Sequence, residues 1–399
     1  MHLKKAFVNG RLLVGDGRII DKASVIINEN RIAEVGRNIE ISGVVETLDC
    51  TGKTIMPGLF DCHLHLFNSD ETRTLRGRES YIEKATMLGV RNAKATLDAG
   101  FTTIKDAGAP PYLNIYLRDM INSGWVTGPR IVTCGFFAMT GGHGGAITGV
   151  DGADNCRRVA RDYLAHNADI IKVAATGGVD SPTAPGAPQY TVDEMAAAFD
   201  EAHKVGKTTC CHAYGAEGIK NAIHAGVDCI DHGNLLDNEC IDLMVKKRIF
   251  LIPTVALRPI REHKRDVLPK SVWEKSMFIL QYMRETKNME KAFRAGVKVA
   301  FGTDWPEGYG LATHGDNAEE FEPMMQLLGM SPTEVITAAT KTSAECLGLD
   351  KQLGTVEAGK LADIIVVDGD PLTNMSVLKE RSKIQIVMKE GQIAARRGI

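Results

Sequence analysis

Several features that would direct this chain to a membrane or to nucleic acid are missing from its sequence. No run approaches the roughly 18 apolar residues that a membrane-spanning helix needs, and the first ten residues contain no apolar signal segment. The formal net charge of −3 leaves no basic excess for binding nucleic acid. We therefore expect a cytoplasmic protein that binds neither membranes nor nucleic acids.

A disulfide framework and a cysteine-based metal motif are missing as well. The nine cysteines are an odd number and contain no CxxC pair. Several lie in apolar runs, and we interpret them as reduced core residues: Cys62, Cys134, Cys210, Cys211 and Cys229. With 44% hydrophobic and 24% charged residues, the composition is that of an ordinary globular protein.

The two ends of the chain have the same pattern and are predicted to form one domain. A length of 399 residues exceeds what one hydrophobic core usually supports. Both ends carry short alternating strands that neither end could bury alone. We predict that residues 1–56 and 353–399 pair into a composite antiparallel β-sandwich. Its expected strands include 5–9, 23–28, 362–367 and 384–389.

Between these ends, residues 57–352 alternate apolar strand runs with helical patterns. Eight such strands favour an α/β fold of the (β/α)8 barrel type over a doubly wound sheet. In a barrel, the C-terminal ends of all strands surround one mouth, so residues far apart in sequence can meet there. The expected strands are 59–66, 102–106, 130–134, 169–174, 207–212, 228–232, 250–254 and 298–304.

Six residues near the ends of these strands are candidate metal ligands. His63 and His65 are two positions apart, so on a strand both imidazoles leave from the same face. The other candidates follow later strands: Lys172, His212, His232 and Asp304. Each also has an ordinary interpretation: an accidental pair, a structural histidine, a barrel salt bridge for the lysine or a helix cap for the aspartate. Their shared position at strand ends favours a metal site.

Two motifs give the chain a resemblance to the amidohydrolase superfamily over essentially its whole length. The segment 57–65, PGLFDCHLH, resembles that superfamily's first-strand motif, and 301–304, FGTD, resembles its eighth-strand motif. The resemblance implies two divalent metal ions, one held by His63, His65 and Asp304 and the other by His212 and His232. Zinc is the default ion for such nitrogen and oxygen donors.

By the same resemblance, Lys172 is carboxylated by CO2 and bridges the two ions together with a hydroxide. A protonated lysine would repel a metal ion, whereas the carbamate offers two ligand oxygens. Asp304 would take the proton of the attacking hydroxide and pass it to the departing amine. The resemblance also suggests a homo-oligomer.

A narrower resemblance lies in the segments 140–144, 172–178 and 212–215. They are similar to a branch with metal-dependent Xaa-Pro dipeptidases, Xaa-Arg carboxypeptidases and ochratoxin-type amidases, related to imidazolonepropionase. That branch cleaves the amide before a C-terminal amino acid, which implies a dipeptide or another small-molecule amide as substrate. A deaminase or cyclic-amide hydrolase is the alternative, but it would normally lack Lys172. A non-enzymatic scaffold would normally lack the ligands.

Three residues are candidate substrate contacts. His143 could donate a hydrogen bond to the scissile carbonyl, or it could face solvent on its glycine loop. Tyr214 could bind a substrate carboxylate or pack in the core. Arg258 follows the seventh strand and could pair with a carboxylate, although a solvated charged helix is the ordinary interpretation of 258–275. The loop 177–188 could form a lid, and 305–316 could line the pocket through Trp305, Tyr309 or His314; a rigid surface turn is the alternative for each.

Overall fold

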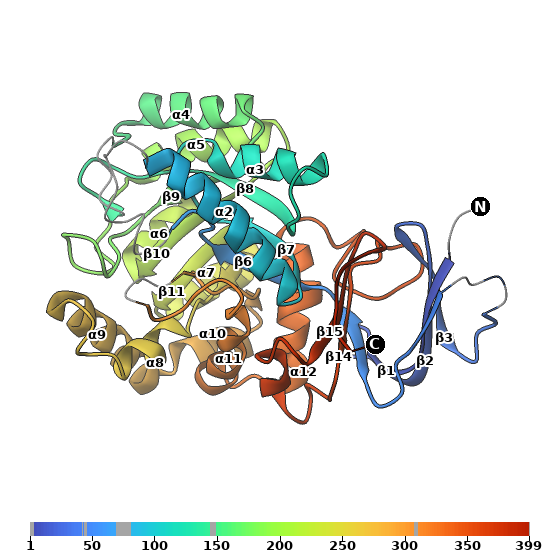
Figure 1. Cartoon of the computed structure of the whole chain (residues 1–399). Helices are drawn as coiled ribbons and strands as arrows, with labels where there is room; N and C mark the ends of the chain where they lie inside the picture. Colours follow the sequence, from blue (N-terminus) through green and yellow to red (C-terminus); the bar gives the residue numbers. More distant parts are fainter. Residues whose placement is uncertain are drawn as a thin grey trace.

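Two eight-stranded sheets organise the chain (Figure 1). The computed structural model describes residues 4–41, 43, 46–68, 81–143, 149–306 and 310–398. The middle of the chain forms one sheet, and helices surround it. The two ends of the chain meet in the other sheet, which lies to one side of the helices (Figure 1).

The middle sheet is parallel, and its strands are neighbours in sequence order. It closes on itself, because Cys62 N donates to Phe301 O at 2.8 Å and His65 N donates to Trp305 O at 2.6 Å. The predicted (β/α)8 barrel is thereby confirmed. Its strands are β6 (Leu59–Leu64), β7 (Phe101–Asp106), β8 (Arg130–Phe137), β9 (Ile170–Ala174), β10 (Thr208–Gly215), β11 (Cys229–Leu235), β12 (Phe250–Ile252) and β13 (Lys298–Val299).

Helices between the barrel strands bury one face each against the sheet, and local capping fixes where some of them begin. Thr191 and Glu194 form a reciprocal capping box at the start of α5, and Asp237 caps α7. Among the described residues, no helix combines the length and apolar composition that a membrane crossing requires. The helices include α2 (Tyr81–Asp98), α3 (Leu113–Asn122), α4 (Ala153–Ala165), α5 (Val192–Lys204), α6 (Ala216–His224), α7 (Asn238–Lys247), α8 (Leu257–Glu262), α9 (Lys270–Thr286) and α10 (Asn288–Arg294).

After the last barrel strand, the chain continues through a second group of short helices before it returns to the terminal sheet. They are η2 (Asn317–Glu320), α11 (Phe321–Leu328), α12 (Pro332–Thr337), η3 (Ala338–Thr342) and α13 (Ser343–Cys346). All nine cysteines are free, and all except Cys346 are buried. Cysteines of four barrel strands pack with Phe60 and Val132 in one apolar cluster, as expected for packing residues.

The terminal sheet has the order β16-β15-β14-β5-β1-β2-β3, with β4 paired to β1. The expectation of a purely antiparallel arrangement was wrong, because β1 pairs in parallel with both β4 and β5. The strands are β1 (Lys4–Leu13), β2 (Ile19–Asn28), β3 (Arg31–Arg37), β4 (Glu46–Asp49), β5 (Thr54–Pro57), β14 (Ile364–Val367), β15 (Ile384–Lys389) and β16 (Gln392–Arg396); the short helix η4 (Met375–Leu378) precedes β15.

Strand β14 joins the two halves of the molecule because its side chains alternate between two cores. Ile364 and Val366 lie in the core of the terminal sheet, whereas Ile365 and Val367 pack in the core that includes the barrel helices. A strand with both faces buried reads as a continuous apolar run, which is what IIVV is. The sheet built from the termini therefore rests firmly against the barrel.

Candidate metal centre and catalytic site

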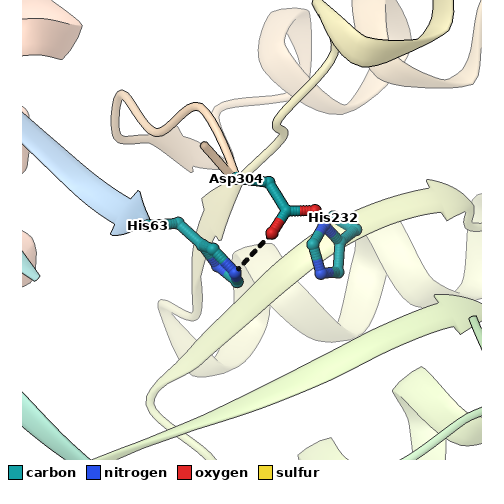
Figure 2. Close-up of side chains that lie close together, drawn as sticks. All are labelled: His63, His232 and Asp304. Atoms are coloured by element: carbon teal, nitrogen blue, oxygen red, sulfur yellow. Dashed lines mark ion pairs between the residues drawn. The ribbon is translucent and has the colours of Figure 1, made fainter. Parts of the chain in front are cut away.

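Three of the predicted ligands form a compact group at the C-terminal ends of the barrel strands (Figure 2). His63 lies on β6, His232 lies on β11 and Asp304 follows β13. Each offers one ligand atom, and these atoms all lie within 4.8 Å of one another. His63 Nε2 is 3.3 Å from Asp304 Oδ1. Two imidazoles and a carboxylate at this spacing can hold a metal ion.

His65 and His212 extend this group on two sides. His65 Nε2 lies 3.5 Å from Asp304 Oδ1, and its ring centroid is 5.4 Å from that of His63. The predicted shared orientation of the HxH pair is therefore observed. The ring of His212 is centred 4.5 Å from that of His232. Its Nε2 is buried and has no hydrogen-bond partner in the part of the chain that the structure describes.

Lys172 completes the set of six and lies between an imidazole, His63, and a carboxylate, Asp231. Its Nζ is 3.2 Å from His63 Nε2 and 3.3 Å from Asp231 Oδ2. As an unmodified amine it has the barrel salt bridge that was its ordinary interpretation. The structure thus brings all six residues together, although Lys172, His212 and His232 lie near the middle of β9, β10 and β11 and not at their last residues.

The histidines are oriented by partners on their other ring nitrogen. His63 Nδ1 lies 3.0 Å from Asp231 Oδ2, and His65 Nδ1 lies 2.8 Å from Gly108 O. His232 Nδ1 lies 2.7 Å from Thr254 Oγ1. Around metal-bound histidines, partners placed in this way hold the proton on Nδ1, so that Nε2 can bind the ion. The donor set therefore fits a metal ion.

Burial and charge set the protonation states of these groups. Burial lowers the pKa of both His212 and His232 well below the usual value, so both imidazoles are neutral, as metal binding requires. Burial alone would raise the pKa of Asp304, but hydrogen bonds from His63 and His65 outweigh it and hold the pKa well below its usual range. Asp304 is therefore an ionised carboxylate, the state in which it can bind a metal ion or accept a proton.

The backbone is in a left-handed conformation at three points of the site. His232 has φ 75°, Thr254 has φ 45° and Asp304 has φ 64°. Residues with side chains rarely adopt this region, and a β-branched threonine least of all. Strand β13 covers only Lys298 and Val299 instead of the predicted 298–304, so it ends well before Asp304. Strain of this kind clusters at functional sites when the surrounding structure over-determines it.

Asp231 and Lys105 are central to this network, and the sequence reasoning missed both. Asp231 is fully buried, and its Oδ1 accepts from Lys105 Nζ at 2.9 Å while Oδ2 faces His63 and Lys172. Burial would raise the pKa of Asp231, but Lys105 and His63 lower it well below the usual value. The signal was present, since each is a charged residue within an apolar strand run, the same argument that singled out Lys172.

We predict that Asp231→Asn lowers metal affinity about 10- to 100-fold, the usual effect of removing a partner of a metal-binding histidine. The uncharged side chain of asparagine no longer attracts the Nδ1–H group of His63 as the carboxylate does. Titration with zinc against a chromogenic chelator measures the change. Asp242→Asn, which removes the same charge from an exposed position on α7, is the matched control. Equal affinities in the two variants would contradict an orienting role for Asp231.

His143 lies beside the candidate metal ligands and not in open solvent. Its half-buried ring stacks on His212 with centroids 3.8 Å apart, and its Nδ1 is 3.4 Å from Ser181 Oγ. Burial lowers the pKa of His143 to about 4, so the ring is neutral. Ser181 belongs to the loop after β9, in which we had predicted no individual site residue. Gly144, the last residue of the motif 140–144, lies outside the described residues.

Arg258 is fully buried, so the ordinary interpretation of a solvated helix was wrong for this residue. Its Nη2 donates to the hydroxyl of Tyr214 at 2.6 Å and lies 3.4 Å from Asn234 Oδ1. Its Nε and Nη1 have no hydrogen-bond partner within the described ranges. Tyr214 is also buried, with its ring centred 4.8 Å from His212 and 4.9 Å from His232. A guanidinium with two unused donors is thus linked by one tyrosine to two of the candidate ligand histidines.

The two loops expected at the mouth make defined contacts with the rest of the barrel. Trp305 is completely buried, and the buried His314 has its Nε2 3.2 Å from His65 O, so both support the HxH segment from behind. Tyr309 lies outside the described residues. The loop 177–188 is tied to α9, because Lys275 Nζ donates to Ser181 O at 2.7 Å and to Thr183 O at 3.1 Å.

Comparison with known proteins agrees with this barrel fold. The model of the amidohydrolase family matches residues 54–394. Ochratoxinase of Aspergillus niger is 28% identical over 428 residues, which cover 98% of this chain and 86% of that protein. A solved Xaa-Pro dipeptidase with methionine bound in its active site has a TM-score of 0.88 and 33% identity, with 98% of this chain and 99% of the other covered. A prolidase complexed with N-methylphosphonate-L-proline has a TM-score of 0.88 and 30% identity, with 99% and 100% covered.

The fold and these relatives define a hydrolase that acts on carbon–nitrogen bonds of amides or peptides. The chain belongs to the amidohydrolase family, as its first-strand and eighth-strand motifs predicted. Members of this superfamily generally use metal ions, and the group of His63, His232 and Asp304 is a possible metal site.

Proposed function

We propose that this protein is a binuclear metal-dependent amidohydrolase that cleaves the amide before a C-terminal amino acid. The observation that carries the proposal is the buried guanidinium of Arg258, which has two unused donors a single tyrosine away from the ligand histidines. A buried cation without a counter-ion is costly, and a substrate carboxylate would supply that counter-ion. The scissile amide of such a substrate would then lie over the ligand cluster.

Six residues of this chain would hold the two ions: His63, His65, His212, His232, Asp304 and Lys172, the last as a carbamate. The donor chemistry favours zinc. When bound, the ions lower the pKa of a water molecule and polarise the substrate carbonyl. Carboxylation of Lys172 requires its neutral amine to leave the contact with Asp231, and the ion pair of Asp231 with Lys105 keeps that carboxylate compensated.

Each of the chain's own residues would then have a separate role in the reaction. The Asp304 carboxylate takes the proton of the attacking water and delivers it to the departing nitrogen. The neutral imidazole of His143 donates a hydrogen bond to the scissile carbonyl, and Ser181 holds its other nitrogen. Arg258 and Tyr214 bind the substrate carboxylate and so set where the amide lies. The relatives support this assignment, since the Xaa-Pro dipeptidase holds a free amino acid, methionine, in its active site.

A panel of dipeptides and N-acyl amino acids, assayed for released amine with and without a chelator, tests the proposed function. We expect hydrolysis of substrates with a free C-terminal carboxylate and its loss on chelation. The panel would also identify the preferred C-terminal residue, for which proline, basic and aromatic side chains are candidates. Release of ammonia from amino-substituted ring compounds would instead favour a deaminase, and ring opening of cyclic amides would favour a cyclic-amide hydrolase. The presence of Lys172 argues against both alternatives.

We predict that Arg258→Met raises KM for free-acid substrates so that kcat/KM falls about 10- to 100-fold, the value of a charged hydrogen bond. A carboxamide-capped substrate should be affected far less, because it offers no charge to lose. Arg294→Met, an exposed arginine on α10, is the control. Equal losses on both substrates would contradict a carboxylate-binding role. Cytoplasmic location and a homo-oligomeric state remain predictions.

A further inference from the structure

A fully buried glutamate behind the site has two unusual partners. Glu320 ends the short helix η2, and its side chain is inaccessible to solvent. Its two carboxylate oxygens accept hydrogen bonds from the consecutive backbone amides of Val255 and Ala256, both at 2.7 Å. No cationic side chain of the described residues pairs with it. The carboxylate is held only by the backbone of another element.

The two amides belong to the turn that joins β12 to α8, and this turn carries two residues of the site. Thr254 precedes the amides, has φ 45° and contacts His232 Nδ1 at 2.7 Å. Arg258 follows them in the first turn of α8 and donates to Tyr214. The helix α8 has only six residues and little stability of its own. The strained Thr254 before it and the buried Arg258 on it therefore need a restraint from another part of the chain.

Resting on the proposed function, we propose that Glu320 is a positioning residue that sets the substrate carboxylate site. Its hydrogen bonds with the amides of Val255 and Ala256, here called the clamp, hold Thr254 in contact with His232 and Arg258 in contact with Tyr214. One side chain thereby sets the distance between the ligand cluster and the guanidinium. That distance determines whether the scissile amide reaches the ligands when the carboxylate is bound.

Only a carboxylate of this length meets the geometry. A glutamine in the same place has one oxygen, so its amino group would face a backbone N–H and leave that donor unsatisfied. The placement is also costly, since burial, and to a smaller extent the negative charges of Asp61 and Asp304, raise the pKa of Glu320 despite the two amide hydrogen bonds. The neighbouring Glu319 makes the contrast, because it is only partly buried and pairs with the cationic Lys379.

The test compares Glu320→Gln with the matched control Glu319→Gln. The measured quantity is the ratio of kcat/KM for an N-acyl amino acid to kcat/KM for its carboxamide. We expect Glu320→Gln to lower this ratio about tenfold, mainly through KM of the acid, and Glu319→Gln to leave it unchanged. In the double variant with Arg258→Met the ratio should fall no further than in Arg258→Met alone. An unchanged ratio in Glu320→Gln, or additive losses in the double variant, would overturn the proposal.

Two further measurements keep the test decisive. Ala256→Pro removes one of the two amide donors to Glu320, at a residue whose φ of −60° suits proline. If Glu320→Gln does not fold, this variant replaces it and should lower the same ratio. Amide hydrogen exchange of the segment 253–258 should accelerate in Glu320→Gln and not in Glu319→Gln, whatever the substrate. Accelerated exchange in an enzyme that cleaves no free-acid substrate would refute the proposed function but not the clamp, whereas unchanged exchange would refute the clamp.

Discussion

Replacing Asp304 by asparagine should lower kcat about 10²- to 10⁴-fold, the range for removing a group that transfers protons in the reaction. The amide retains an oxygen at the same place but cannot accept a proton. The ionised state of Asp304 follows from its contacts with His63 and His65, at 3.3 and 3.5 Å. Steady-state kinetics on the best substrate of the panel, with metal content measured on the same sample, give the result.

Asp350→Asn, which changes an exposed aspartate after α13, is the matched control and should retain full activity. Asp304→Asn with bound metal and nearly normal kcat would contradict the assigned proton transfer. Loss of activity that is fully restored by excess metal would show that Asp304 acts as a ligand alone.

The second large effect is expected for Lys172→Ala, which should abolish turnover. If Lys172 carries a carbamate, its removal takes two ligand oxygens from between the ions and leaves a cavity of similar shape. Short-chain carboxylic acids such as acetate or propionate should fill that cavity and restore part of the activity. Kinetics with increasing acid, and with the corresponding carboxamide as control, measure the rescue.

Full activity of Lys172→Ala would instead support a purely structural salt bridge between Lys172 and Asp231, in which Nζ lies 3.3 Å from Oδ2. Rescue by the carboxamide as well as by the acid would also argue against the carbamate, because an amide supplies no charge to bridge two cations.

The barrel and the ligand positions were predictable from the sequence because both depend on local patterns. Apolar strand runs alternate with helical ones, and residues such as His63 and Asp304 stand where such runs end. The strand bounds were less predictable. Strand β13 ends at Val299, well before Asp304, and no sequence signal indicated the left-handed conformation of Asp304.

The support of the site could not be predicted because it depends on contacts between distant segments. Lys105 meets Asp231 across the barrel, and Glu320 reaches the backbone of Val255 and Ala256. Backbone acceptors and donors leave no trace in the sequence. Arg258 was placed correctly near the seventh strand, but its burial was missed, because the charged residues around it suggest a solvated helix.

The most direct test is the metal content of the purified protein, combined with diffraction at the zinc absorption edge. The account predicts two ions per chain, one among His63, His65 and Asp304 and one beside His212 and His232, with extra density on Lys172 Nζ. An active enzyme with no bound ion, or with Lys172 unmodified and paired with Asp231 in the active crystal, would contradict it.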